Sequence, residues 1–203
     1  MKKNYQKELD RLINEIPEGQ TPSLLLHACC APCSSYVLEY LSEYYSITVY
    51  YYNPNITEEG EYIKRINELK RLIREMPLKN EVIFMEGPYD PEVFFEMAKG
   101  MESLPEGGER CYHCYELRMR EAARIAAEKG FDYYTTTLSI SPHKNADWIN
   151  EIGERLATEY AVHHLPSDFK KRDGYKRSIE LSAKYDLYRQ SYCGCVYSKN
   201  VVI

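Results

Sequence analysis

The sequence predicts an α/β protein built on one doubly wound, mostly parallel sheet of the Rossmann-like kind. Two observations support this fold class. Runs of β-branched and aromatic residues alternate with longer amphipathic segments along the 203 residues, and turn signals separate them. Alternating strands and helices favour right-handed βαβ units and hence a parallel sheet. No composition shift, repeat or low-complexity stretch marks a boundary, so we expect one domain over residues 1–203.

The first half of the chain alternates helices with strands. Residues 1–20 carry Leu and Ile at helical spacing before Pro17, which predicts a short N-terminal helix. The apolar run Leu24–Cys29 predicts the first strand, Pro32 marks a turn, and Ser34 is expected to cap the next helix. The elements expected after that turn are helix 34–45, strand 47–52, helix 58–75, strand 81–85 and helix 92–99.

The second half repeats the alternation. Residues 101–108 are rich in turn residues and predict a loop. We expect residues 166–203, the final helix and a cysteine-bearing irregular tail, to fold back over the carboxyl edge of the sheet. The expected elements are helix 111–129, strand 133–138, a helix from 141 to about 159, strand 161–165, helix 174–184 and the tail 187–203.

Composition excludes several classes of protein. The chain is 44% hydrophobic and 28% charged, as ordinary globular proteins are, and no apolar run approaches the roughly 20 residues that span a membrane. Its charged N-terminus lacks the apolar centre of a signal peptide, so we expect a cytoplasmic protein with no membrane partner. A net charge of −5 does not favour nucleic-acid binding, but the stretch from Leu165 onward has a local excess of Lys and Arg that could contact phosphates.

The seven cysteines are the strongest signal, because they fall into three clusters. In a chain of this kind, such clusters indicate metal or redox chemistry rather than a disulfide framework. Ligand sets made only of thiolates select zinc or iron–sulfur groups, and seven thiols exceed one four-ligand site. The sequence therefore predicts one cluster plus a second metal, or one site plus free thiols. The clusters are Cys29, Cys30 and Cys33; Cys111 and Cys114; and Cys193 and Cys195.

The cysteines have two other possible interpretations. A structural zinc ion is one of them, although the first cluster follows a strand at the end of the sheet where ligands bind. A thiol oxidoreductase is the other, because Cys30 and Cys33 flank Ala-Pro at a strand–helix junction. That reading leaves the four cysteines of the second and third clusters without a role.

Polar residues near the expected strand ends are weaker candidates. Asp90 follows the third strand and is either a carboxylate ligand or a helix cap. His143 and Lys144 follow the fourth strand, where they could hold an anion. Asp168 is either an acid or an ion-pair partner of neighbouring basic residues. Arg189 and Gln190 precede the last two thiols, so we expect them to lie near whatever the metal serves.

Taken together, the motifs resemble the cobalamin-independent epoxyqueuosine reductase family. The resemblance covers roughly residues 23–198 and rests on HACCAPCS, YYNPNI, ERCYHCYELR, TTTLSISPHKN, LPSDFKKRDGYKRSIELS and LYRQSYCGCVYS. It implies reduction of the epoxide of epoxyqueuosine, at the wobble position of tRNA, to the alkene of queuosine. It also implies a 4Fe–4S cluster with a neighbouring metal, expected to be mononuclear iron or another metal, and a fold related to adenine-nucleotide α-hydrolase-like domains.

With that resemblance, the metal ligands can be divided as a hypothesis. We expect Cys111, Cys114 and part of the first cluster to hold the cubane, with Asp90 as a fourth ligand. The remaining first-cluster thiols, with Cys193 and Cys195, would hold the second metal. An external one-electron donor is needed to refill the cluster.

The reaction that this resemblance implies needs a proton source and a surface that binds tRNA. The candidates for the proton source are Asp168, Tyr192 and His143. Tyrosines could stack on bases. The basic candidates for tRNA contacts are Lys170, Lys171 and Arg172, together with Lys64, Arg65, Lys70 and Arg71.

Two alternatives come from other functional classes. A tRNA-thiolating or other sulfur-transfer enzyme could share such a sheet, but CCAPCS occupies the position where nucleotide-activating enzymes usually carry a glycine- and serine-rich pyrophosphate loop. A zinc-organised binding module without catalysis is the second. The colour of the purified protein distinguishes it, because iron–sulfur proteins are brown and zinc proteins are colourless.

Overall fold

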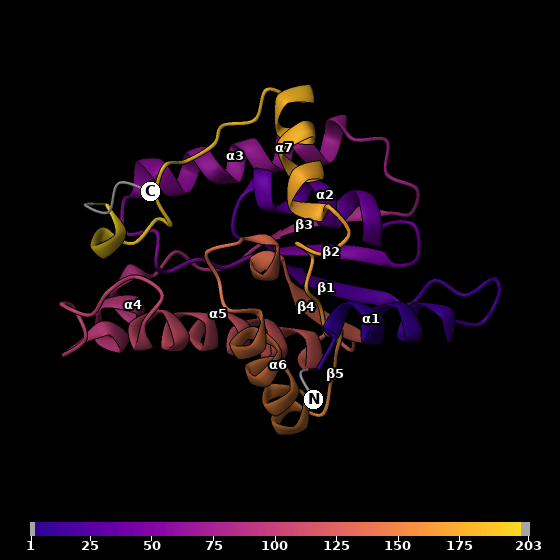
Figure 1. The fold of residues 1–203 in the computed structure, drawn as a ribbon, viewed down its shortest axis with the longest axis horizontal. Helices are drawn as coiled ribbons and strands as arrows, with labels where there is room; N and C mark the ends of the chain where they lie inside the picture. Colours follow the sequence, from indigo (N-terminus) through magenta and orange to yellow (C-terminus); the bar gives the residue numbers. More distant parts are fainter. Residues whose placement is uncertain (1–2, 200–203) are drawn as a thin grey trace.

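A five-stranded, wholly parallel sheet forms the centre of the protein in the computed structural model, which describes residues 3–199 (Figure 1). The strand order is β3-β2-β1-β4-β5, so the chain winds outward from β1 first to one side and then to the other. This order confirms the expected doubly wound α/β fold. The strands are β1 (Ser23–His27), β2 (Ser46–Tyr51), β3 (Val82–Glu86), β4 (Tyr133–Thr136) and β5 (His163–His164).

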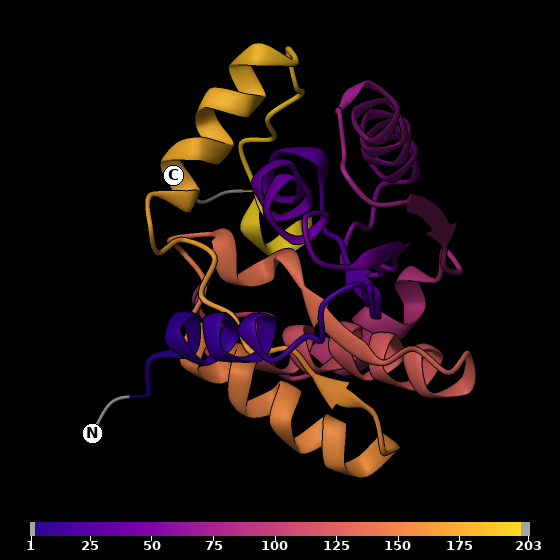
Figure 2. The ribbon, with the colours of Figure 1, turned by 90° about the vertical axis from the view of Figure 1, so that its right-hand side faces the viewer.

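Helices cover both faces of this sheet (Figure 2). α2, α3 and α7 lie on one face, and α5 and α6 lie on the other. There are also two short 3₁₀ helices in the described part. η1 (Thr137–Ile140) follows β4, and η2 (Val196–Ser198) lies near the end of the described tail. The α-helices are α1 (Tyr5–Asn14), α2 (Ala31–Leu41), α3 (Glu59–Glu75), α4 (Pro91–Ala98), α5 (Glu109–Glu128), α6 (Ala146–Tyr160) and α7 (Gly174–Lys184).

The central strand β1 is buried on both faces. Leu24 and Leu26 pack with the core that α2 and α3 complete, whereas Leu25 packs with α5 and α6 on the opposite face. All three leucines are fully buried. A central strand of a parallel sheet reads as a continuous apolar run because helices cover both of its faces, and this explains why the run was recognisable from the sequence.

The reversal of winding direction lies between β1 and β4. β1 pairs with β2 on one side and with β4 on the other. In open α/β sheets, ligands bind in the crevice outside the carboxyl ends of the strands at such a switch point. The segments that leave these two strands, residues 28–33 and 137–144, therefore meet at the edge of the sheet where a site is expected.

The first helix after β1 starts earlier than expected. α2 begins at Ala31, with Cys30 in the N-cap position, and the prediction of a start capped by Ser34 is wrong. Pro32 is compatible with the first helical turn, because the N–H groups there have no partner within the helix. The Ser34 hydroxyl instead donates to the carbonyl of Cys30 at 2.8 Å. As a result, the helix begins within the first cysteine cluster.

The helix after β4 starts later than expected. Residues 137–140 form η1 rather than the end of a strand, and α6 begins only at Ala146. The side chain of Asn145 accepts hydrogen bonds from the N–H groups of Asp147 (3.0 Å) and Trp148 (3.2 Å), which defines the start of the helix. His143 and Lys144 therefore lie in a turn before the helix, where both side chains can face the sheet edge.

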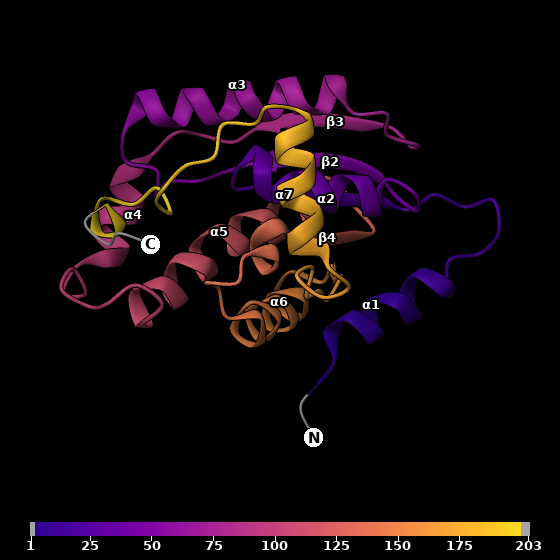
Figure 3. The same cartoon turned by 45° about the horizontal axis from the view of Figure 1, so that its top comes forward.

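The C-terminal tail runs from α7 along α3 toward α4 (Figure 3). Arg71 of α3 donates hydrogen bonds to the carbonyls of Tyr185 (3.0 Å) and Asp186 (3.2 Å), and Glu68 accepts one from the N–H of Tyr188 at 2.7 Å. These contacts carry the last two cysteines to the start of α5. Residues 1–2 of the expected N-terminal helix and 200–203 of the expected tail lie outside the described part.

No helix within residues 3–199 combines the length and the hydropathy needed to cross a membrane.

Candidate metal centre and adjoining cavities

The thiols of Cys29, Cys30 and Cys33, called the trio below, lie together just after β1. Their sulfur atoms are all within 4.8 Å of one another, and those of Cys29 and Cys30 are 3.8 Å apart. An ion that binds thiolates tetrahedrally at about 2.3 Å places the sulfurs roughly 3.8 Å from one another. The trio therefore has the spacing of ligands to a single metal ion.

Neighbouring strands hold the backbone of the trio in place. The N–H of Cys29 donates to the hydroxyl of Thr137 at 3.3 Å, in the segment that follows β4. The amide of Asn53, beyond β2, donates to the carbonyl of Ala28 at 2.8 Å. Cys30 adopts an extended conformation before α2 begins. Segments following three adjacent strands thus contribute to the position of the trio.

The three thiols share negative charge unequally. Hydrogen bonds from Cys30 and Cys33 hold the pKa of Cys29 well below its usual value. The same hydrogen bonding raises the pKa of Cys30 to about 12 and that of Cys33 well above the usual value. One thiolate is therefore stabilised by two thiols. Metal binding would displace the remaining protons, since thiolate is the form that binds metal.

The other four cysteines, Cys111, Cys114, Cys193 and Cys195, line one small cavity, called the thiol cavity below. No three of their sulfurs all lie within 4.8 Å of one another in the described structure, in contrast to the trio. Each thiolate of a cubane cluster binds a different iron, so cluster ligands stand farther apart than those of one ion. The wider spacing in the thiol cavity suits a cluster better than a single ion.

Backbone contacts position the two segments that carry these four cysteines. At the start of α5, the N–H of Gly107 donates to the sulfur of Cys111 at 3.3 Å. In the tail, Gly194 has a φ of +118°, and a Cβ there would lie 2.9 Å from Ile56. The guanidinium of Arg65 donates to the carbonyl of Cys193 at 3.2 Å. Only glycine fits between the two tail cysteines without strain.

Unpaired polar atoms indicate that the thiol cavity is built for a bound group. Burial raises the pKa of Cys114 to about 12. Arg118 and Glu106 also line the cavity, and each has a buried side-chain atom without a hydrogen-bond partner in the described structure. Such atoms are costly to leave unpaired. Together with an all-thiol donor set, they fit a metal–sulfur group in this cavity.

A second cavity of about 300 Å³, called the outer cavity below, adjoins the thiol cavity. Glu106 and Cys193 line both. Cys33 of the trio lines the outer cavity as well. The outer cavity is therefore in contact with both groups of thiols. Five residues singled out in the sequence lie along its wall: His143, Lys144, Arg189, Gln190 and Tyr192.

The tail residues of this wall are held by the fold. Arg189 donates to the hydroxyl of Ser182 at 3.0 Å, and the guanidinium carbon of Arg65 lies 5.5 Å from the ring centroid of Tyr192. The amide oxygen of Gln190 is buried without a partner among residues 3–199. This oxygen could accept a hydrogen bond from a molecule in the outer cavity. Substrate contacts by Arg189 and Gln190 remain predictions.

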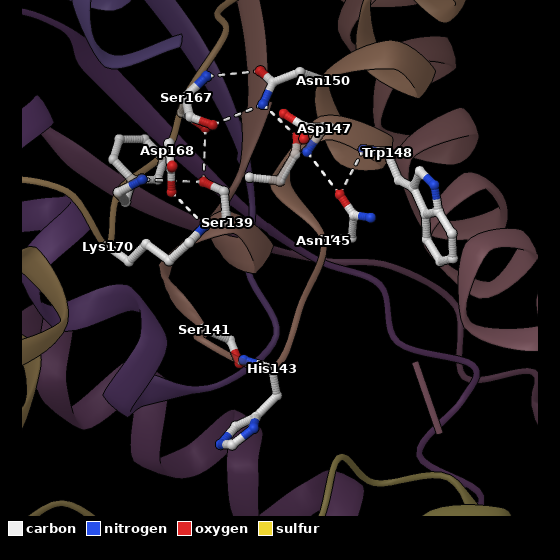
Figure 4. Close-up of polar contacts among 12 residues, drawn as sticks. Ser139, Ser141, His143, Asn145, Asp147, Trp148, Asn150, Ser167, Asp168 and Lys170 are labelled. Carbon is white, nitrogen blue, oxygen red and sulfur yellow. Dashed lines mark hydrogen bonds and ion pairs between the residues drawn. The ribbon is translucent and has the colours of Figure 1, made fainter. Parts of the chain in front are cut away.

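Asp168 lies on a different cavity, about 650 Å³ in volume and called the lysine cavity below. Lys144, Lys170 and Lys171 also line it, and Asp168 forms an ion pair with Lys170. Figure 4 shows this pair beside Ser139, whereas His143 points away from it. His143 and Lys144 line both the outer and the lysine cavities, so the two are neighbours. The proton-source role of Asp168 stays a prediction.

Three residues expected to bind metal or tRNA lie outside the walls of the outer and lysine cavities. Asp90 is exposed before α4 and does not line the thiol cavity, so its role as a ligand stays a prediction without support from this geometry. Arg172 is exposed and pairs with Asp10. The expectation that Arg65 contacts tRNA is wrong, because Arg65 is only 2% exposed and pairs with Glu61 at 2.7 Å.

Sequence reasoning missed two charged residues of the thiol cavity. Glu106 was part of a loop recognised only by its turn residues, although it precedes Cys111 by five positions. Arg118 follows Cys114 by four positions, one helical turn, and so lies on the same face of α5. That spacing was the available signal for Arg118. No pattern in the sequence distinguished Glu106 from its exposed acidic neighbours.

Fold and site together define an α/β protein with two groups of thiols, suited to binding metal, at the carboxyl edge of a parallel sheet. The model of the epoxyqueuosine reductase QueH family matches residues 24–201. The chain belongs to this family and is therefore an oxidoreductase.

Curated relatives agree with this assignment. The epoxyqueuosine reductase QueH of Streptococcus pyogenes serotype M1 is 43% identical over 205 residues, covering 98% of this chain and 80% of the relative. That of Staphylococcus epidermidis is 44% identical over 200 residues, covering 96% and 84%. That of Acinetobacter baylyi is 42% identical over 191 residues, covering 93% and 85%.

A solved structure shows the same fold. The U34-tRNA thiolase NcsA from Methanococcus maripaludis, solved with its [4Fe-4S] cluster, aligns with a TM-score of 0.52 and 14% identity. The alignment covers 96% of this chain and 68% of that one. At this level of identity the likeness concerns the fold alone.

Proposed function

We propose that this protein reduces epoxyqueuosine to queuosine at the wobble position of tRNA, using a 4Fe–4S cluster and a second metal. The observation that carries the proposal is the outer cavity, which has one thiol from each thiol group in its wall: Cys33 and Cys193. Membership in the epoxyqueuosine reductase family supports the reaction. A volume of about 300 Å³ is within the range of small-molecule sites.

The reaction requires electrons and protons from outside the substrate. Two C–O bonds of the epoxide break, a C=C bond forms, and the oxygen leaves as water. This consumes two electrons and two protons. A bound 4Fe–4S cluster would supply the electrons one at a time, after receiving them from an external one-electron donor.

The spacing of the sulfurs suggests how the two metal groups divide the thiols. The four cysteines of the thiol cavity would hold the cubane, and the trio would hold the mononuclear metal. This differs from the division expected from the sequence, in which the trio was shared between the two groups. Among the described residues, only the trio has three sulfurs close enough together, within 4.8 Å of one another, to suit one tetrahedral ion.

Lys144 is the proposed contact for the epoxide oxygen. Within residues 3–199 it pairs with no carboxylate, and it lines the outer cavity. Burial lowers the pKa of Lys144, but attraction to the negative charge of nearby cysteines in their thiolate form, namely Cys193, Cys29 and Cys33, outweighs that effect and raises it. The ammonium group therefore stays charged and can donate a hydrogen bond to an oxygen bound beside the thiols. His143 and Tyr192 lie on the same wall as candidate proton donors.

The lysine cavity is the proposed contact for tRNA phosphates next to the modified nucleotide. Replacing Lys170, Lys171 and Arg172 by Gln should weaken tRNA binding and reduce its dependence on salt, because fewer counterions are then released. Binding measured by fluorescence anisotropy over a range of salt concentrations tests this. An unchanged affinity at every salt concentration would remove this surface from the proposal.

Anaerobic purification followed by iron and sulfide quantification tests the metal content. Incubation with a chemical reductant and tRNA that carries epoxyqueuosine tests the reaction. Mass spectrometry of the digested nucleosides should show the loss of one oxygen atom from the modified nucleoside. A protein that holds iron and sulfide but leaves the epoxide intact would contradict the proposed reaction.

The same experiment separates the two alternatives. A tRNA-thiolating enzyme would consume ATP and add sulfur to the nucleoside. A zinc-organised binding module would be colourless and leave the tRNA unchanged. Reduced thiols suit the cytoplasm, which is the compartment we propose.

A further inference from the structure

Arg118 is a buried cation that the assignment of metal ligands leaves without a role. It lies on α5 one turn after Cys114 and is only 1% exposed. Its Nε atom donates to the carbonyl of Cys114 at 3.0 Å, and its guanidinium carbon lies 5.8 Å from the ring centroid of Tyr115. Its Nη2 atom is buried and has no hydrogen-bond partner among residues 3–199. The side chain lines the thiol cavity.

The other two buried arginines have more partners. Arg65 pairs with the carboxylate of Glu61 at 2.7 Å and also donates to a backbone carbonyl. Arg110 donates to three backbone carbonyls in the loop before α5. Arg118 has one carbonyl and no carboxylate in the described structure. Among residues 3–199 it is thus the buried arginine with the fewest hydrogen-bond and ion-pair partners, although the carboxylate of Glu106 lines the same cavity without pairing with it.

An uncompensated buried cation destabilises a folded protein, and so does a buried N–H donor without an acceptor. Both costs are offset if an anion occupies the thiol cavity. A cubane with four thiolate ligands is such an anion, and its sulfur atoms accept hydrogen bonds. The four cysteines in the same cavity would supply these thiolates.

We propose that Arg118 donates a hydrogen bond from Nη2 to a sulfur of the cluster held in the thiol cavity, and that its charge raises the cluster's reduction potential. This rests on the proposed function. One-electron reduction, by the external one-electron donor, adds a negative charge to the cluster without forming or breaking a bond. A fixed cation stabilises the reduced cluster more than the oxidised one, because attraction grows with charge.

Two variants and a control test this inference. Arg118→Met keeps a long side chain without charge or donors, and Arg118→Lys keeps the charge without the planar donors. Arg124→Met is the control, because Arg124 is a half-exposed residue of the same helix that pairs with Glu121 and Glu128. Each protein is prepared anaerobically. Iron content, the reduction potential from a titration followed by electron paramagnetic resonance, and the thermal unfolding of the metal-free form are then measured.

We expect Arg118→Met to bind iron and to have a more negative reduction potential than the original protein, with Arg118→Lys in between and Arg124→Met unchanged. We also expect metal-free Arg118→Met to be at least as stable as the metal-free original, because the variant lacks the uncompensated charge. Loss of iron from the Met variant alone, with a folded metal-free protein, supports the same role for the charge.

Three results would overturn the inference: an unchanged potential in an iron-loaded Arg118→Met protein, loss of iron from both variants, or a metal-free Arg118→Met protein that is less stable than the original. Each would mean that Arg118 serves only the fold around Cys114. Failure of the proposed function gives a different result, namely an original protein without a cubane signal.

Discussion

The trio and the thiol cavity bring cysteines together in two different ways. The trio comes from a single strand–helix junction, where five consecutive residues contain three thiols. The thiol cavity joins the start of α5 to a tail that crosses α3 before it arrives. The first group depends on local geometry. The second depends on the docking of a distant segment, and it should be the first to fail when that docking is weakened.

The charges around the two groups differ as well. In the trio, thiols stabilise a neighbouring thiolate through hydrogen bonds, which holds the pKa of Cys29 down. In the thiol cavity, burial raises the pKa of Cys114 to about 12, and the nearby cation Arg118 only partly opposes this. The trio therefore keeps one thiolate in the folded, metal-free protein, whereas Cys114 stays protonated.

The largest expected effects come from substituting one thiol in each group. Cys114→Ser should remove the cluster and leave the metal of the trio, whereas Cys30→Ser should do the reverse. Each should lower activity by more than the roughly 10–100-fold that loss of an outer partner of a metal ligand costs. Iron and sulfide contents, with Mössbauer spectra, distinguish the two losses.

Loss of the cubane signal in Cys30→Ser would show that the two groups are not separate. It would restore the division expected from the sequence, with the trio shared between the metals.

A smaller effect is expected from a substitution at Gly194, which forms the tail turn between the last two cysteines. Gly194→Ala places a Cβ 2.9 Å from Ile56 at a positive φ, so it should lower the free energy of unfolding by about 1–3 kcal/mol. Because the strain falls between two ligands of the thiol cavity, cluster content should fall as well while the trio keeps its metal. Denaturant unfolding and iron analysis measure both.

Gly100→Ala is a matched control for that variant. Gly100 also has a positive φ, but no atom lies within 4 Å of an added Cβ. Equal loss of the cluster in both variants would contradict a specific role for the tail turn.

Weakening the contact between α3 and the tail should have a still smaller effect. Arg71→Leu removes the hydrogen bonds to Tyr185 and Asp186, together with the ion pairs to Glu68 and Glu75 within α3, and should cost about 1–2 kcal/mol. Limited proteolysis should then cut the tail sooner, and the thiol cavity should lose iron faster than the trio under a chelator. Lys79→Leu, which removes only an exposed pair with Glu43, serves as the control. Equal rates of iron loss from the two groups would argue against this order.

The smallest effect is expected from Asp90→Asn. Asp90 is exposed and does not line the thiol cavity, so iron content and activity should stay within about twofold of the original, as is usual for a surface change. Glu106→Gln is the matched comparison, because its buried carboxylate oxygen faces the cavity without a partner. It should reduce iron content more than Asp90→Asn. The reverse order would support Asp90 as a ligand.

Local patterns predicted most of the fold. The leucines of β1 are buried on both faces, so their apolar run marked a central strand. The starts of α2 and α6 were misplaced, since a cap is chosen by competition between nearby residues. Asn145 bonds two N–H groups at the start of α6, and this excludes an earlier start near Ser141.

The sequence by itself determined that a parallel sheet carries three cysteine clusters, because strand patterns and cysteine spacing are local properties. Only the tertiary structure decided how the thiols are grouped and which charged residues face them. Arg65 and Arg118 look like surface residues in the sequence, but both are buried where α3, α5 and the tail meet the thiols. The physical reason is that burial and pairing depend on segments far apart in the chain, and no local pattern records which of them will meet.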